Sequence, residues 1–114
     1  MATIKFEVLT YEVTIARELN AMSGGLSLKF PAYVVCKGAE YDAVIYVLDD
    51  TSPVPANTFT PATKHGTIFV PRWQFEWIRD LLRNETPVYC NLNSDTPKWN
   101  SLSTGTEPIG EGEV

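Results

Sequence analysis

The amino-acid sequence predicts an α+β fold that is mainly antiparallel β-sheet, barrel- or sandwich-like, with one amphipathic helix at residues 72–83 packed on it. The predicted order is β-β-β-β-α-β-β. Two observations support this class. Most of the chain alternates apolar with polar residues or forms short β-branched apolar runs, and both patterns are typical of strands. Only one segment repeats its apolar residues with the period of a helix.

The helix is the clearest local feature of the sequence. Pro71 stands where the helix begins, and a proline there loses no hydrogen bond inside the helix. The apolar side chains fill an arc of about 200° around the helix axis. They are Trp73, Phe75, Trp77, Ile78, Leu81 and Leu82. An arc this wide indicates two partner surfaces: one sheet face, and either a second element or a second chain.

The first part of the chain is predicted to hold strands separated by irregular segments. The apolar residues of segment 3–15 change face near Val8 and Leu9. Because side chains alternate with a period of two, this change indicates a bulge, a bend or two separate strands. Residues 16–25 are predicted to be a loop with at most one helical turn. Pro31 interrupts the next strand and indicates an edge or a bulge.

The rest of the chain is predicted to add a hairpin, a long loop and a second strand pair. Residues 33–36 and 41–48 are predicted to pair around a glycine-containing turn. Residues 49–64, rich in proline and threonine, are predicted to be a surface loop of a length that is often functional. After the helix, a strand at residues 88–92 is predicted to pair with a polar strand at residues 98–104.

Length and composition indicate one small domain. The chain has 114 residues, 44% of them hydrophobic, and a formal net charge of −5. We expect a single β-rich domain at residues 1–104 and a disordered acidic tail of glycine and glutamate at residues 105–114. No apolar run reaches the length of a membrane span, and the first residues lack the pattern of a signal peptide. We therefore expect a cytoplasmic protein with no membrane partner.

The sequence offers little material for catalysis. His65 is the only histidine, and the motifs of nucleophile elbows, P-loops and dinucleotide-binding folds are missing. Cys36 and Cys90 are too few for a disulfide framework and are expected to be buried free thiols. Asp49 and Asp50 form a carboxylate pair, but no other oxygen ligands are spaced in the sequence in a way that suggests a divalent-metal site. We therefore expect no cofactor, metal or catalytic residue, and keep an enzyme that uses His65 with one of these aspartates as an alternative.

Aromatic residues give the stronger indication of function. Trp73 and Trp77 lie one helical turn apart, with Phe75 between them. The ordinary interpretation is that these rings pack on a sheet. The alternative is a surface that binds a partner or a second copy, because tryptophan is favoured at interfaces. We take Trp73, Trp77 and Phe75 as the candidate partner-binding residues.

Trp99 lies in a different setting. Its neighbours in the sequence carry amides, hydroxyls and a carboxylate, which suits stacking on a sugar or a base with hydrogen bonds at the edge of the ligand. The candidate ligand-binding residues are Trp99, Asn91, Asn93, Asp95 and Asn100. The alternative is a half-buried tryptophan in a polar strand.

The run Gly-Thr-Ile-Phe-Val-Pro at residues 66–71, followed by a tryptophan-bearing helix, resembles the strand-to-helix ending of coactivator-type and Whirly-type single-stranded-DNA-binding domains. The resemblance covers residues 64–83 and implies a basic sheet face with stacking aromatics. The predicted sheet strands carry more acids than bases, namely Lys5, Lys29 and Lys37 against Glu7, Glu12, Glu40 and Asp42. Because clustered cations supply much of the affinity for phosphates, nucleic acid is kept only as an alternative partner.

The function predicted from these features is a non-catalytic binding or assembly module. It would form a homo-oligomer or dock a protein partner through the edge of the tryptophan stripe or the loop at residues 49–64. A single-stranded nucleic-acid-binding protein is the first alternative, and an enzyme that uses His65 is the second.

Overall fold

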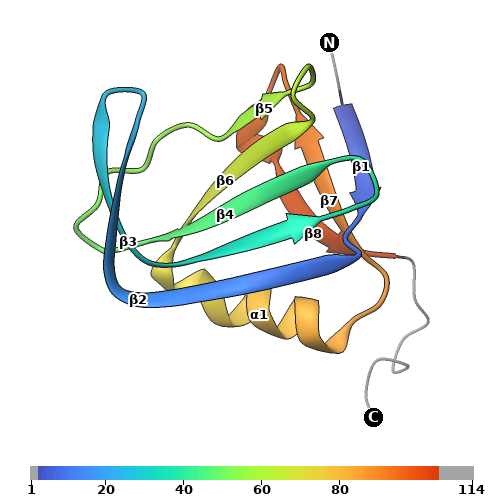
Figure 1. Cartoon of the computed structure of the whole chain (residues 1–114), viewed down its shortest axis with the longest axis horizontal. Coiled ribbons are helices and arrows are strands. Elements are labelled where there is room, and N and C mark those ends of the chain that lie inside the picture. Colours follow the sequence, from blue (N-terminus) through green and yellow to red (C-terminus); the bar gives the residue numbers. More distant parts are fainter. Residues whose placement is uncertain (1–2, 106–114) are drawn as a thin grey trace.

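The computed structural model describes residues 3–105 and consists of two β-sheets with a short helix across one end (Figure 1). The strands are β1 (Thr3–Glu7), β2 (Thr10–Ser23), β3 (Leu26–Lys37), β4 (Asp42–Leu48), β5 (Thr58–Thr60), β6 (His65–Pro71), β7 (Val88–Asn93) and β8 (Ser101–Thr104). The helical segments are η1 (Arg72–Gln74), α1 (Phe75–Asn84) and η2 (Pro97–Trp99). The larger sheet has the order β2-β3-β4-β6-β5 and the smaller has the order β1-β7-β8. The predicted α+β class is confirmed.

The predicted helix forms almost as expected. Pro71 is extended, and the chain becomes helical at the next residue, first as the 3₁₀ turn η1 and then as α1. The helix ends at Asn84, and the Glu85 N–H donates a hydrogen bond to the Leu81 carbonyl at 3.1 Å. A proline start and a following extended residue therefore set both ends of the helix.

The change of face near Val8 and Leu9 marks the passage between the two sheets. β1 pairs with β7 in the smaller sheet, and β2 pairs with β3 in the larger one. The Val8 N–H donates to the Val88 carbonyl and the Leu9 N–H to the Lys37 carbonyl, each at 2.8 Å. These neighbouring residues thus bond to opposite sheets. Of the three predicted alternatives, two separate strands is the one that forms.

The prediction of a loop at residues 16–25 is wrong for residues 16–23 and is confirmed only for the turn at Gly24 and Gly25. β2 continues through this segment to Ser23 and pairs with β3 around a tight turn at Gly24 and Gly25, which have φ values of 56° and 82°. Such left-handed conformations are typical of glycine in two-residue hairpin turns. Between Ile15 and Leu19 the register shifts opposite Pro31, so the predicted bulge is confirmed. The bulge interrupts the alternation of apolar and polar residues along β2. The sequence therefore shows no regular strand pattern over this segment.

The segment 49–64, predicted as one loop, contains a short edge strand. β4 and β6 run parallel, so the chain must return along the molecule between them. On that return it forms β5, which pairs antiparallel with β6 and buries Phe59. The Asn57 side-chain oxygen accepts a hydrogen bond from the Phe69 N–H at 2.7 Å and so extends this contact beyond β5. Three residues are too few to show an alternation, so the sequence gives no sign of β5.

The larger sheet buries side chains on both faces. Its inner face, which includes Ile45, forms the main core together with β7. On the outer face, Tyr46 stacks on Phe69 with ring centroids 5.2 Å apart. The far half of the β2–β3 hairpin, which turns away from the sheet at the left of Figure 1, adds Leu28 and Phe30 to this second cluster. Each face of the larger sheet thus contributes to its own apolar cluster.

Both cysteines are buried free thiols, as predicted. Cys36 on β3 and Cys90 on β7 belong to the main core between the sheets. Burial raises the pKa of each thiol to about 12, because the thiolate form loses its hydration. Neither thiol is therefore a ready nucleophile at neutral pH.

Two further predictions concern the C-terminal tail and the membrane. The predicted acidic tail at residues 105–114 lies outside the described residues, except for Gly105. Among residues 3–105, no helix combines the length and the apolar character needed to cross a membrane.

Candidate functional site

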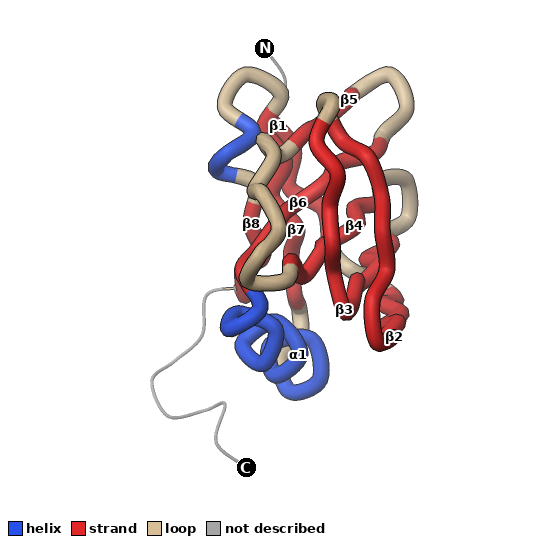
Figure 2. Tube along the Cα trace, turned by 90° about the vertical axis from the view of Figure 1, so that its left-hand side faces the viewer, coloured by secondary structure: helices blue, strands red, loops and turns tan. Residues whose placement is uncertain are grey.

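The apolar residues of η1 and α1 lie on two different sides of this helical segment. Phe75, Ile78 and Leu82 face inward and pack on the core between the sheets. Trp73 and Trp77 face outward, and 62% and 65% of their surfaces are exposed. We refer to these two residues as the tryptophan pair. Figure 2 shows the helix at one end of the sheets.

The two indoles of the tryptophan pair contact each other. Their ring centroids are 5.0 Å apart and their planes are inclined by 84°, which is the edge-to-face geometry that aromatic rings favour. Phe75, the third predicted partner-binding residue, is half-buried and belongs to the inner side. The Arg79 guanidinium lies over its ring, 5.9 Å from the centroid. The predicted set is thus split, with two members on the exposed side and one in the core.

An apolar pocket of about 360 Å³ opens beside the tryptophan pair. It lies between α1, the inner face of the larger sheet and β8. Among the described residues that line it, none is charged. The lining residues are Ile45, Ile68, Val70, Gln74, Trp77, Ile78, Leu81, Asn100, Ser101 and Leu102. Trp77 therefore belongs both to the exposed pair and to the wall of the pocket.

Charged side chains surround the outward side of the helix. Arg72 donates to the Asp50 carboxylate at 2.9 Å and so fixes the start of η1 to the segment after β4. Glu76, Asp80 and Arg83 are exposed on α1. An apolar centre with a charged rim is the usual anatomy of a protein–protein interface.

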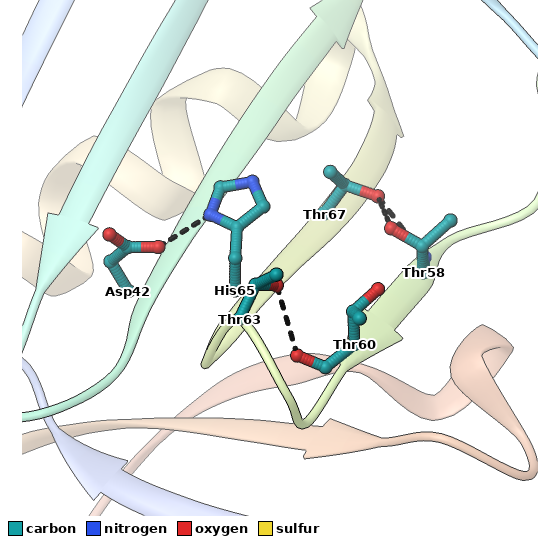
Figure 3. A network of polar contacts seen from close by, with 6 residues as sticks. All are labelled: Asp42, Thr58, Thr60, Thr63, His65 and Thr67. Carbon is teal, nitrogen blue, oxygen red and sulfur yellow. Dashed lines mark hydrogen bonds and ion pairs between the residues drawn. The ribbon is translucent and has the colours of Figure 1, made fainter.

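His65 does not meet either of the two aspartates proposed for it. It pairs with Asp42 across the parallel strands β4 and β6, with 2.5 Å between Nδ1 and the carboxylate oxygen (Figure 3). Asp49 and Asp50 follow the opposite end of β4. The Asp49 carboxylate accepts hydrogen bonds from the backbone and side chain of Thr51, which lower its pKa. The sequence had a signal for the true partner, since Asp42 and His65 begin two runs of equal length.

In the described part of the chain, the threonine hydroxyls close to the His65–Asp42 pair form their hydrogen bonds with other groups. Thr58 and Thr67 share a hydrogen bond of 2.7 Å between their own hydroxyls, and the Thr63 hydroxyl donates to the Thr60 carbonyl at 3.2 Å (Figure 3). No hydrogen bond within residues 3–105 joins a threonine hydroxyl to the histidine. An imidazole becomes a general base only when the group that it deprotonates lies within hydrogen-bond reach. The pair as it stands fastens the adjacent ends of two strands.

Trp99 lies in a turn rather than in the predicted strand at residues 98–104. Pro97 begins the 3₁₀ turn η2, and the strand starts only at Ser101 because the Asn100 N–H is bonded to the Pro97 carbonyl at 2.9 Å. Trp99 is 67% exposed, and Lys98 lies 5.9 Å from its ring centroid. The expectation of a half-buried strand tryptophan is therefore replaced by an exposed ring on a turn.

Most polar residues predicted around Trp99 hold the fold together. The Asn93 side-chain oxygen accepts hydrogen bonds from the backbone N–H groups of Asp95 and Thr96 at 2.9 and 2.8 Å. Asn100 is only 6% exposed and bonds to three backbone groups of other strands. Asn91 donates to the hydroxyls of two serines on β8. The amides proposed to bind a ligand thus already have partners within the chain.

Within residues 3–105, no cluster of three or more histidine, cysteine, aspartate or glutamate side chains is placed to hold a metal ion. Comparison with protein-family models, with curated proteins and with solved structures finds no match to this chain. The candidate site therefore rests on the geometry of its own residues.

Proposed function

We propose that this chain is a small, non-catalytic, cytoplasmic binding module that docks a second protein chain on the tryptophan pair and the adjoining pocket. The observation that carries the proposal is the exposure of Trp73 and Trp77, at 62% and 65%, on a helix whose other side is buried. Isolated exposed hydrophobic residues are ordinary, but two contacting indoles beside an uncharged pocket form a continuous apolar surface.

The free energy expected from covering the tryptophan pair supports the proposed docking of a protein chain. A tryptophan buries roughly 150–250 Å² when fully covered, at about 25 cal/mol per Å². Covering the exposed part of Trp73 or Trp77 would then contribute roughly 2–4 kcal/mol for each ring, before the costs of association. Two such residues are enough to act as the hot spot of a modest interface.

The pocket suggests how a partner would be held. An aliphatic or aromatic side chain of the partner would enter beside Trp77 and contact Ile78 and Leu81. The charged residues around the rim would then select among partners, because rim charges influence specificity more than affinity.

Site-specific photo-cross-linking tests this function. A photoreactive amino acid is placed at position 77 and, as the matched control, at position 99, whose tryptophan is equally exposed but lies on η2. The proposal predicts one defined cross-linked protein from position 77, whose purified form binds the wild-type chain and the Trp99→Ala variant but not the Trp77→Ala variant. Equal cross-linking from both positions, or binding that survives Trp77→Ala, would contradict it.

A further inference from the structure

The strand β2 leaves one of its edges open. It has 14 residues and pairs only with β3, and no other described strand pairs with its far side. Figure 2 shows β2 at the free margin of the larger sheet. The backbone groups along such an edge can pair with another extended chain. The straight part of this edge is residues 10–15, because the bulge opposite Pro31 begins after Ile15.

The same edge carries exposed apolar side chains. Ile15 is 69% exposed and Tyr11 is also exposed. These residues pair with Ala32 and Cys36, whose side chains lie in the core between the sheets. Because directly opposed residues point to the same face of a sheet, Tyr11 and Ile15 lie on the inner face, at its margin. An added strand would therefore continue the core and cover both side chains.

We propose that a second copy of this chain pairs antiparallel with residues 10–15 of β2, around a two-fold axis at Val13, and joins the two larger sheets into one. This interface is separate from the tryptophan pair, so either proposal can fail without the other. A two-fold axis relates identical patches, which closes the assembly as a dimer.

The sequence of the edge selects the register. A two-fold axis between antiparallel strands is perpendicular to the sheet, so one residue lies on the axis and opposed residues share a face. An axis at Glu12 would oppose two carboxylates, which is unfavourable. An axis at Thr14 would bring the bulge into the paired segment. The axis at Val13 opposes Tyr11 to Ile15 of the second copy and places Glu12 opposite a neutral threonine.

This register is the reason for proposing that a second copy of the chain, rather than an unrelated strand, pairs with β2. It brings the two exposed apolar side chains of the edge into contact with each other on both sides of the axis. Aromatic and β-branched residues form favourable cross-strand pairs. The paired segment would contain about six residues, which is the length of an average strand. It ends at the bulge that contains Arg17 and Glu18. A contact of this size gives a weak dimer that depends on concentration.

Disulfide trapping with introduced cysteines tests the register. Cys36 and Cys90 are fully buried, whereas Val13 is half-buried and Ile15 is exposed, so an introduced thiol at either position is more accessible than the native ones. Glutathione disulfide serves as the oxidant and is reduced to two glutathione molecules for each bond formed. Val13→Cys is expected to give a covalent dimer, because residue 13 of one copy lies opposite residue 13 of the other. Ile15→Cys, on the same face, is the matched control and should remain monomeric. Adding Tyr11→Cys to that control should restore the cross-link.

Light scattering of the uncrosslinked chain completes the test. The wild type should show a monomer–dimer equilibrium, and Ile15→Lys should raise the dissociation constant at least about tenfold. The double variant Trp73→Ala/Trp77→Ala should keep the wild-type equilibrium. A wild type that is monomeric at every concentration, or equal cross-linking of Val13→Cys and Ile15→Cys, would overturn the proposal. Far-UV circular dichroism of each variant establishes that the compared chains are folded.

Discussion

At the scale of single residues, Asn100 shows how a residue proposed for binding can serve the fold instead. Its side-chain oxygen accepts a hydrogen bond from the Asn93 N–H at 2.8 Å. Its amide nitrogen donates to the carbonyls of Thr58 at 3.0 Å and Thr67 at 3.2 Å. The strands β5 and β6 of the larger sheet are thereby joined to β7 and β8 of the smaller one.

Replacing Asn100 by alanine is expected to lower the free energy of unfolding by roughly 2–4 kcal/mol, because each buried group left without a partner costs about 1–3 kcal/mol. Asn91→Ala is the control, since that amide bonds to serine hydroxyls on the surface of β8, and its effect should be below about 1 kcal/mol. Urea unfolding followed by circular dichroism measures both. Equal losses would show that Asn100 does not join the sheets as described.

The buried thiols predict a loss of stability at high pH. Cys36 and Cys90 have folded-state pKa values of about 12, against 9.0 for the free thiol. Between these values the unfolded chain has lost protons that the folded chain keeps, so stability falls as the pH rises above about 9. Each thiol contributes about 1.4 kcal/mol per pH unit to this fall.

Denaturant unfolding at several pH values checks this, with the variant Cys36→Ala/Cys90→Ala as the comparison. The variant is less stable overall because it leaves cavities, but its stability should fall less steeply between pH 9 and pH 12. Identical slopes for the two proteins would show that the thiols do not govern the decline.

At the scale of elements, the helix α1 has two unequal sides. Leu82 is buried in the core, whereas Trp73 and Trp77 stand in solvent. The side that packs against the sheets therefore carries the stability of the helix, and the outward side remains exposed to solvent.

This division predicts opposite results for two substitutions. Leu82→Ala should destabilise the chain by roughly 2–5 kcal/mol, the usual range for a buried leucine. The double variant Trp73→Ala/Trp77→Ala should change stability by less than about 1 kcal/mol, because it removes mainly exposed surface. Thermal unfolding at low protein concentration measures both. A large loss in the tryptophan variant would mean that the indoles support the fold.

The sequence predicted those elements whose patterns are local. Pro71 and the apolar period predicted the helix, and the hairpin of β3 with β4 and the pair β7–β8 followed from alternation and turns. The features that the sequence does not indicate depend on contacts between segments that are distant in the chain. The strand β2 extends past its bulge because β3 lies beside it, and the parallel pairing that joins His65 to Asp42 follows from the return of the chain through β5.

The candidate site was predictable only in part, for a related reason. The apolar arc of the helix indicated two partner surfaces, but the sequence could not show that Phe75 would face the core and Trp73 the solvent. The pocket beside Trp77 is formed by β4, β6, β8 and α1 together, and no single segment contains its pattern. The sequence indicates a turn at residues 93–97 and a strand from residue 98, but the helical turn η2 continues through Trp99 and the strand begins only at Ser101.

At the scale of the whole molecule, the charges argue against nucleic acid as a ligand. The formal net charge is −5, and several cations are already engaged. Lys64 pairs with Glu40 and Arg72 with Asp50, each at 2.9 Å, while Lys5 lies over the ring of Tyr89.

Fluorescence anisotropy with labelled single-stranded oligonucleotides at low salt is therefore expected to show no binding. Low salt is the most permissive condition, because phosphate contacts weaken as salt rises. Salt-dependent binding in this assay would favour the nucleic-acid alternative over the protein-docking function.

Docking on the tryptophan pair requires that Trp73 and Trp77 stand in solvent on the isolated chain. Acrylamide quenching of the Trp99→Phe variant, which retains only Trp73 and Trp77, tests it most directly. The structure predicts emission close to that of a free indole and quenching nearly as efficient as that of N-acetyltryptophanamide. Blue-shifted emission that resists acrylamide, in a chain shown to be monomeric, would contradict the account.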